Sequence, residues 1–307
     1  MTVAWWAWVA VIAFITAMLA VDLVLHRNAE AMSTREALTW SAVWITISVA
    51  FGGVVWATLG SEAAGSYYAG YLIEKSLSVD NLFVFALLFQ FFAVPAAYQH
   101  RVLFWGVIGA LVFRAIFIVA GAALLGAFHW MFYLFGAFLI YSGFKLLRSS
   151  EMGVHPERNP VLQFLRRRFR ITPDYHGPHF LTKVKGLWWA TPLLAVLIVV
   201  ETTDVLFAVD SIPAIFAVTR NTFLVFTSNA FAILGLRALY FLLANVLGRF
   251  TYLKAGLAAV LGFVGLKLLA SDLVEPPIWV SLVVITVLIG GSILASLAGP
   301  APAIEDG

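Results

Sequence analysis

Residues 74–81 read EKSLSVDN and residues 201–211 read ETTDVLFAVDS, and both segments place carboxylates inside stretches that are otherwise apolar. An ionised carboxylate is costly in hydrocarbon unless it meets a cation, a hydrogen-bond donor or water. Acidic side chains within a membrane span therefore indicate a path for a substrate or for protons. The two segments together predict a polytopic membrane protein that transports cations.

The composition of the whole chain agrees with a membrane location. Of its 307 residues, 62% are hydrophobic and 11% are charged, and its mean hydropathy is +0.96. A soluble domain of ordinary composition is far more polar. Apolar stretches of about 20 residues can cross the hydrocarbon core as helices, because helices satisfy their own backbone hydrogen bonds. The expected fold class is therefore all-α and polytopic.

Hydropathy and turn residues divide the chain into about nine expected transmembrane helices. Their expected ranges are 3–25, 37–59, 68–92, 101–126, 130–148, 187–216, 221–247, 252–270 and 277–298. A long loop at 149–186 carries a cluster of arginines and lysines, and the positive-inside rule places such loops in the cytoplasm. Alternation of the spans then puts the N-terminus outside and the C-terminus in the cytoplasm.

Three consecutive expected spans recur later in the chain. Aligning the two acidic segments pairs Glu74 with Asp204 and Asp80 with Asp210, and downstream FRAIF resembles LRALY and YSGFKLL resembles FVGLKLL. Because each unit holds an odd number of spans, the second copy enters the membrane from the opposite side, as in transporters built from inverted repeats. The expected domains are N-terminal helices at 1–60, a first repeat at 61–148, the basic loop at 149–186, a second repeat at 187–271, and a last helix and tail at 272–307.

The polar side chains of the two acidic segments supply oxygen ligands. The candidate metal ligands are Glu74, Asp80, Asn81, Glu201, Asp204 and Asp210. Hard divalent ions such as Mn²⁺, Ca²⁺ and Mg²⁺ prefer oxygen ligands. The histidines fall in loops or at span ends, so the imidazole ligands that Zn²⁺, Cu²⁺ and Ni²⁺ prefer are missing from the middle of the spans. We therefore expect a hard divalent cation as substrate and no cofactor.

The second acidic segment does not suit a straight helix. Glu201 and Asp210 are nine residues apart and would point in nearly opposite directions. Pro213 lacks the N–H that would bond the carbonyl of Val209, so we expect the helix to break or kink there. A break would free carbonyl oxygens as further ligands, as in the discontinuous helices of transporters.

Three basic residues, Lys75, Arg114 and Arg237, lie within the expected spans, and we expect them to pair with carboxylates or to gate the path. Such pairing is also the alternative to a metal site, because ion pairs within the membrane hold helices together. Five acids against three bases leave about two negative charges, which one divalent cation would neutralise. Carboxylates lose protons when they bind a metal, so proton exchange is the expected coupling.

Several function classes lack their sequence signals. The chain has no cysteine, which excludes disulfides, thiolate metal sites and redox-active thiols. It has no Gly-rich phosphate loop, and neither a His-Glu-x-x-His nor a Gly-x-Ser-x-Gly motif, so we expect no enzyme activity. A net charge of +3 is too small to indicate nucleic-acid binding. The expected partners are a divalent metal ion and membrane lipid, and the oligomeric state stays open.

The paired segments EKSLSVDNLFVF and ETTDVLFAVDSIPAIF resemble the two acidic motifs of the TerC family of bacterial integral membrane proteins. The length and span count resemble the Alx-type members of that family. The resemblance implies manganese efflux across the bacterial inner membrane, with a historical link to tellurite resistance and a relation to LysE-like exporters. The acidic positions of the family correspond here to Glu74, Asp80, Glu201, Asp204 and Asp210.

The leading hypothesis is a secondary active exporter of Mn²⁺ that works by alternating access around the acidic site. An exporter of an amino acid or an oxyanion would instead use Arg114 and Arg237, and its substrate binding would survive neutralisation of Asp80. A membrane-embedded metalloenzyme or an assembly partner for envelope proteins is the third reading. A scaffold of that last kind would tolerate Asp80→Asn or Asp210→Asn without loss of ion flux.

Overall fold

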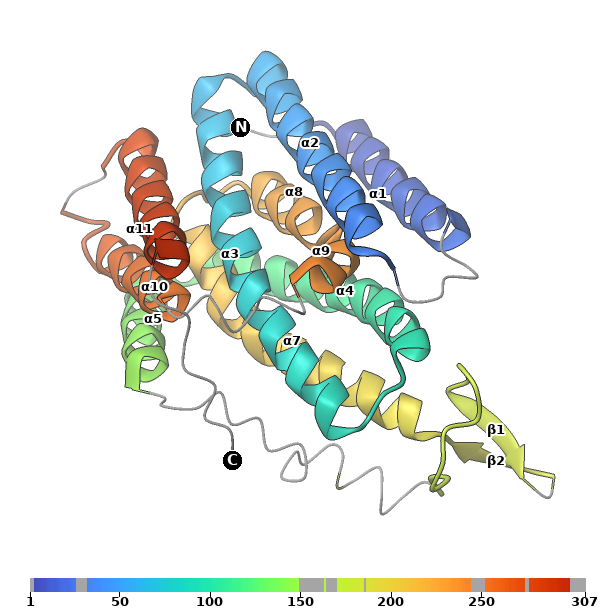
Figure 1. Cartoon of the computed structure of the whole chain (residues 1–307). Coiled ribbons are helices and arrows are strands. Elements are labelled where there is room, and N and C mark those ends of the chain that lie inside the picture. The colour runs from blue at the N-terminus through green and yellow to red at the C-terminus, as the bar shows by residue number, and fades with distance from the viewer. Residues whose placement is uncertain are drawn as a thin grey trace.

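The computed structural model describes residues 3–25, 32–148, 163, 170–184, 186–243, 252–273 and 276–298. They form helices α1 (Trp5–Leu25), α2 (Thr34–Leu59), α3 (Ser61–Phe91), α4 (Ala96–Ala127), α5 (Met131–Arg148), α7 (Pro192–Phe216), α8 (Thr222–Ile233), α9 (Leu236–Leu243), α10 (Leu253–Leu269) and α11 (Ile278–Ala298), and strands β1 (Leu181–Val184) and β2 (Leu187–Ala190). Figure 1 shows the helices packed together, with the β1–β2 hairpin at one end beside the start of α7. The described chain is thus almost entirely helical, as expected.

Six helices are long and apolar enough to cross a membrane, namely α1, α2, α4, α5, α7 and α11. The pair α8 and α9, bent by 42° at a short break, qualifies as a seventh span. Of the two other long helices, α3 carries charged residues along its 31 positions and α10 has 17 residues. The described residues form a polytopic membrane protein with six or seven apolar spans, and the expected count of nine is not confirmed.

The expected sixth span begins later than its hydropathy indicates. Residues 187–190, which read LWWA, pair as strand β2 with residues 181–184 of β1 in an antiparallel hairpin. Tryptophan favours strands, and α7 starts only at Pro192. Proline suits a first helical position because the N–H that it lacks would have no partner inside the helix. The hairpin therefore lies at the end of the expected loop 149–186 and at the start of the expected sixth span, and it leads directly into α7.

The expected break at Pro213 is wrong, because α7 continues through this residue to Phe216. Pro213 lies in the last turn of the helix, where its missing N–H removes one hydrogen bond, that to the carbonyl of Val209. The chain leaves the helix soon afterwards, and the N–H of Ala217 donates to the carbonyl of Pro213 at 3.0 Å. The proline thus stands near the helix end and does not divide the helix.

Helices of the two expected repeats pack in reciprocal pairs, α3 against α8, α4 against α7 and α5 against α10. Between α5 and α10, a Cβ on Gly136 would lie 2.9 Å from the carbonyl oxygen of Gly265, and one on Gly143 would lie 2.8 Å from that of Ala258. The alignment of YSGFKLL with FVGLKLL equates Gly136 with Ala258 and Gly143 with Gly265. Swapping the two aligned units therefore converts each of these contacts into the other, as a two-fold relation between the units would require. The inverted repeat itself remains a prediction.

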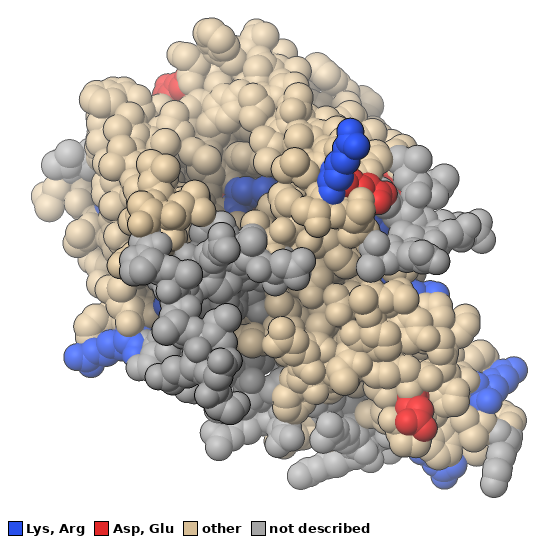
Figure 2. Space-filling view, in the orientation of Figure 1, with Lys and Arg blue, Asp and Glu red and all other residues tan. Residues whose placement is uncertain are grey.

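The outward faces of the helices are apolar, and large side chains such as Trp56, Ile116 and Val119 are exposed there. Figure 2 shows one such face, on which the described charged residues are few and scattered. An apolar exterior of this extent suits contact with lipid. Four charged side chains of the described residues are nevertheless buried in the interior, those of Glu74, Arg114, Asp204 and Arg237.

Candidate cation site

A buried ion cluster joins three helices of the two expected repeats. Arg114 of α4 donates from Nη1 to Oε1 of Glu74 on α3. It also donates to Asp204 of α7, from Nε to Oδ2 at 3.2 Å and from Nη2 to Oδ1 at 3.0 Å. The three residues are at most 4% exposed. Glu74 and Asp204, which the repeat alignment pairs, therefore meet at one guanidinium.

Two polar side chains complete this cluster. Arg114 Nη1 also donates to the hydroxyl of Ser211 at 3.3 Å, and Asn229 of α8 donates from Nδ2 to the second carboxylate oxygen of Glu74 at 3.0 Å. Four hydrogen bonds thus leave the guanidinium, which has five N–H groups. With both acids ionised the Arg114 cluster carries one net negative charge, and removing one partner from such a buried group costs about 3–5 kcal/mol.

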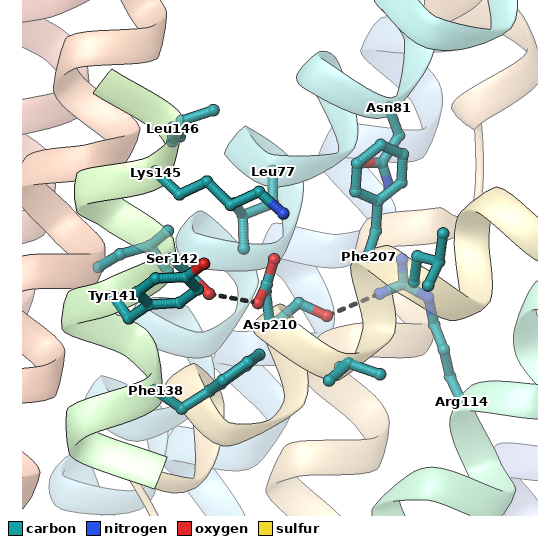
Figure 3. Close-up of a pocket in the computed structure, with 14 residues that line it drawn as sticks. Leu77, Asn81, Arg114, Phe138, Tyr141, Ser142, Lys145, Leu146, Phe207 and Asp210 are labelled. Carbon is teal, nitrogen blue, oxygen red and sulfur yellow. Dashed lines mark hydrogen bonds between the residues drawn. The ribbon is translucent and has the colours of Figure 1, made fainter. Parts of the chain in front are cut away.

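A pocket of about 410 Å³ opens beside the Arg114 cluster, and we call it the Asp210 pocket. Its polar lining side chains are Asn81, Arg114, Tyr141, Ser142, Lys145, Asp210 and Ser211. Ser142 of α5 donates from its hydroxyl to Oδ1 of Asp210 at 2.8 Å. Figure 3 shows both side chains in the pocket, with Lys145 extending from the same helix toward Asp210 and Arg114 on the far side.

The Asp210 pocket brings the two acidic segments together. Asn81 of α3 and Asp210 of α7 both line it, and Asn81 is 2% exposed. The backbone of Asp80 lies in α3 next to Asn81, and its side chain is outside the described residues. The oxygens of Asn81, Ser142, Asp210 and Ser211 are of the type that hard divalent ions accept.

Glu201 lies apart from this pocket, on the face of α7 that meets α4. A Cβ placed on Gly109 of α4 would overlap its carboxylate, so the acid packs directly on the backbone of that helix. The Oε2 atom of Glu201 is buried without a hydrogen-bond partner among the described residues. Glu201 therefore lies outside the Asp210 pocket, and its role as a metal ligand stays a prediction.

The other two basic residues pair away from the acidic segments. Arg237 of α9 donates from Nη2 to Oδ1 of Asp22 on α1 at 2.6 Å. Lys75 donates from Nζ to the carbonyl oxygen of Ala232 at 3.1 Å. The three bases were expected to pair with carboxylates or to gate the path. Arg114 and Arg237 do pair with carboxylates through described contacts, and those of Arg114 alone belong to candidate ligands. Arg237 therefore contributes no charge to the balance at the site.

The six candidate ligands thus divide into separate places. Glu74 and Asp204 are held by Arg114, Asn81 and Asp210 line the neighbouring pocket, and Glu201 faces α4. Among the described residues, no three His, Asp or Glu side chains are arranged to hold a metal ion. The metal site remains a prediction that would need these groups to move together.

The sequence prediction passed over several polar residues that the structure places at the site. Asn229 reaches Glu74 from α8, while Ser142 and Lys145 reach the Asp210 pocket from α5. The signal for the last two was present, because both belong to the YSGFKLL segment of the repeat. Asn229 carried a weaker signal, a lone amide in an apolar stretch. Polar side chains in spans warrant the same attention as acidic ones.

The sequence of this chain is similar to those of known membrane proteins and matches one protein family. The model of the "Integral membrane protein TerC family" matches residues 59–301. The "Uncharacterized membrane protein STKORF319" of Myxococcus xanthus is 53% identical over 291 residues, which are 94% of this chain and 91% of the relative. No solved structure matches the chain.

Two further relatives cover similar lengths. The "Putative membrane-bound redox modulator Alx" of Escherichia coli strain K12 is 49% identical over an alignment of 292 residues that covers 91% of this chain and 90% of the relative. An "Uncharacterized membrane protein" of Rickettsia felis is 40% identical over 292 residues, 95% of this chain and 97% of the relative. The similarity therefore extends over almost the whole of each protein and includes both acidic segments.

Proposed function

Because this chain belongs to the integral membrane protein TerC family, which the resemblance of its acidic segments predicted, we propose that it is a secondary active transporter that exports Mn²⁺. Export takes place across the bacterial inner membrane, in exchange for protons and by alternating access. Other hard divalent cations are further substrates, and the protein is not an enzyme. The N-terminus lies outside and the C-terminus in the cytoplasm.

The observation that carries this proposal is the position of Asp210 in a pocket of about 410 Å³ beside the Arg114 cluster. The pocket gathers a carboxylate, an amide and three hydroxyls from α3, α5 and α7. The ammonium of Lys145 balances the carboxylate of Asp210, and the adjoining cluster carries one net negative charge. Mn²⁺ prefers carboxylate, carbonyl and water oxygens. A hydrated ion would enter at Asp210 and exchange part of its water shell for these oxygens.

Arg114 provides a way to complete the site. It occupies Glu74 and Asp204 in this conformation. A divalent cation near Ser211 would compete with the guanidinium for the same carboxylates, because each stabilises their ionised form. When the ion leaves, Arg114 would take back Glu74 and Asp204, and a proton that binds Asp210 would supply the exchange, since a carboxylate loses its proton when it binds a metal ion. Arg114 thus acts as the counter-charge of Glu74 and Asp204 in this conformation.

The Alx relatives are named as redox modulators. This chain lacks the residue type that most often carries out redox chemistry in proteins. It has no cysteine, so no thiol or disulfide can exchange electrons. Such a membrane protein would influence the redox balance of the cell through the metal ion that it transports. The redox name and metal transport are therefore compatible proposals for one protein.

An amino acid or oxyanion exporter is less well supported. Such a transporter would need a basic group free to bind the anion, and Arg114 directs four of its five N–H groups to protein oxygens. Arg237 is engaged by Asp22 away from the Asp210 pocket. Arg114 and Arg237 are therefore partners of carboxylates in this conformation, in keeping with a cation path.

The test is uptake of Mn²⁺, Ca²⁺, Mg²⁺ and Zn²⁺ into proteoliposomes, read with a metal-sensitive dye inside. We expect Mn²⁺ flux that falls at least about tenfold in Asp210→Asn and in Ser142→Ala, as loss of ligands and their supporting groups does in metal sites. Asp174→Asn, an exposed acid far from the pocket, is the matched control and should transport normally.

Three outcomes count against the proposal. Equal flux in Asp210→Asn and Asp174→Asn would remove Asp210 from the path. Flux that ignores an imposed pH gradient would remove proton exchange. Transport of an amino acid or oxyanion that requires Arg237 and not Asp210 would establish the competing function.

A further inference from the structure

A second pocket, of about 370 Å³, lies at the opposite end of α3 from Asn81, and we call it the Glu62 pocket. Its polar lining side chains are Glu62, Ser66, Thr219, Arg220, Lys267 and Ser271. They come from the start of α3, the turn after α7 and the end of α10. The hydroxyl of Ser271 is buried there without a hydrogen-bond partner among the described residues. This pocket is polar, although the apolar cluster of the core lies directly behind it.

The two pockets occupy opposite ends of one group of four helices. Along α3, Ser66 lines the Glu62 pocket and Leu77 lines the Asp210 pocket, about 16 Å apart at 1.5 Å per residue. In α5, Phe132 lines the Glu62 pocket and Ser142 the Asp210 pocket, so this helix runs in the same direction. In α7 and α10 the order of the two pockets along the chain is reversed.

Buried apolar side chains fill the space between the pockets. The residues that form this apolar barrier are Ile73 of α3, Leu139 of α5, and Ile212 and Ile215 of α7. None is more than 3% exposed, and none lines either pocket. They belong to one cluster whose outer members reach both pockets, with Leu261 lining the Asp210 pocket and Phe216 the Glu62 pocket. The barrier is therefore continuous from one pocket to the other.

The barrier is closed by direct contact between α7 and α3. A Cβ on Gly70 of α3 would lie 3.1 Å from Cγ2 of Ile215, so the isoleucine rests on the backbone of the facing helix. A constriction lined by such side chains excludes water and stops an ion that keeps its hydration shell. No path for a hydrated cation therefore crosses the barrier in this conformation.

From this arrangement we infer that the Glu62 pocket is the second mouth of the transport path, and that the apolar barrier is the gate that closes it. The inference rests on the proposed cation transport for the identity of the substrate, and on the two pockets for the path itself. On this inference the Asp210 pocket opens toward one face of the membrane, and the Glu62 pocket is a separate vestibule that opens toward the other. Transport requires α3 and α7 to part at Ile73 and Ile215 while the Asp210 side closes.

The gate can be tested by labelling, since the chain has no cysteine and every introduced thiol is the only one. Ser66→Cys, Ser142→Cys and Ala69→Cys are treated with a small, charged, membrane-impermeant thiol reagent in intact cells and in inside-out vesicles. We expect Ser66→Cys and Ser142→Cys each to react roughly tenfold or more faster from one face than from the other, and from opposite faces, because the charged reagent does not cross the membrane.

Ala69→Cys measures where the vestibule ends. Ala69 lies one helical turn beyond Ser66 on the same face of α3, is fully buried and lines neither pocket. We expect its thiol to be protected from both faces. Reaction of Ser66→Cys and Ser142→Cys from one face, or free reaction of Ala69→Cys in the otherwise unchanged chain, would overturn the inference.

A second set of variants tests the gate residues and allows for misfolding. Ile215→Ala removes part of the barrier, and Ile285→Ala removes the same group from α11, where it is equally buried in the same cluster and lines neither pocket. We expect Ala69→Cys to become reactive with Ile215→Ala and to stay protected with Ile285→Ala. Equal effects of the two would show general loosening and would reject the gate.

These readouts separate the gate from the proposed substrate. Labelling does not depend on which ion is carried, so failure of Mn²⁺ flux with labelling from opposite faces would reject the proposed function and leave the gate standing. Normal Mn²⁺ flux with the thiols of both pockets reacting from the same face would reject the gate and leave the proposed function standing.

Discussion

Arg114 holds Asp204 through two hydrogen bonds, from Nε to Oδ2 at 3.2 Å and from Nη2 to Oδ1 at 3.0 Å. This fork places the guanidinium and the carboxylate in one fixed geometry, which a lysine ammonium cannot reproduce. The remaining amino group reaches Glu74, so the same arginine ties α4 to both α7 and α3. A cation that competes for these carboxylates would act directly on the packing of three helices.

Arg114→Lys should therefore weaken the fold even though it keeps the charge. One or more buried carboxylate oxygens lose their donors, and we expect a loss of about 1–3 kcal/mol in the free energy of unfolding. Thermal unfolding in detergent measures the change. Arg148→Lys, at an exposed arginine that lies over the ring of Phe144, is the control and should leave the midpoint unchanged. Identical midpoints for the two variants would contradict the role of the fork.

Asn229 is expected to support the same cluster from the other side. Its Nδ2 donates to Glu74 at 3.0 Å, and both residues are at most 1% exposed. Asn229→Ala leaves a carboxylate oxygen of Glu74 without this donor. We expect the free energy of unfolding to fall by about 1–3 kcal/mol. Thr286→Ala removes a hydroxyl on the exposed face of α11 and serves as control. If chemical unfolding gives equal free energies for both variants, Asn229 does not stabilise Glu74.

The structure makes a sharper prediction at Gly109. A methyl group there would overlap the carboxylate of Glu201, so Gly109→Ala must displace that side chain or separate α4 from α7. We expect a lower unfolding temperature, and recovery of it when Glu201→Ala is added. Gly53→Ala has open space around the new Cβ and should stabilise its helix by about 0.5–1 kcal/mol. A destabilisation by Gly109→Ala that Glu201→Ala fails to reverse would show that the overlap is not its cause.

The class of the fold and the types of residue at the candidate site could be predicted from the sequence. Which residues pair with one another depends on tertiary packing. An acid in an apolar stretch needs a cation, a hydrogen-bond donor or water, so pairing of Glu74 and Asp204 with a basic residue was one of the arrangements expected from the sequence, beside a metal site. That both share Arg114 did not follow, since the contacts join positions 40 and 90 residues apart. The repeat gave Arg237 an equivalent role, and the structure gives it Asp22 instead.

Local context explains the other differences. Hydropathy treats LWWA at 187–190 as the start of a span because it ignores the pairing with 181–184 that makes it a strand. The effect of Pro213 depends on its distance from the helix end. The expected span already ended at residue 216, so the proline falls in the last turn, where a missing N–H does not break the helix. Asn229 and Ser142 act through contacts with distant helices. None of these contacts is local enough to be predicted from residue type and spacing.

A last prediction concerns Asp272, which follows α10 and lies outside the spans. It accepts hydrogen bonds from Tyr133 and His129 of the neighbouring α4–α5 region, and these contacts lower the pKa of its carboxyl below the ordinary value, with the tyrosine hydroxyl as the largest cause. A lowered pKa in the folded state stabilises the protein above the unfolded-state pKa of about 3.9, and this stabilisation is lost as the pH falls through the folded-state value. Asp272→Asn should therefore have a lower unfolding temperature than the unaltered protein at pH 7, with the difference shrinking on acidification. Asp174→Asn, which removes an exposed acid elsewhere, is the control and should leave the unfolding temperature at pH 7 unchanged. A difference for Asp272→Asn that stays constant from pH 7 into the acid range would mean that ionisation of Asp272 does not stabilise this contact.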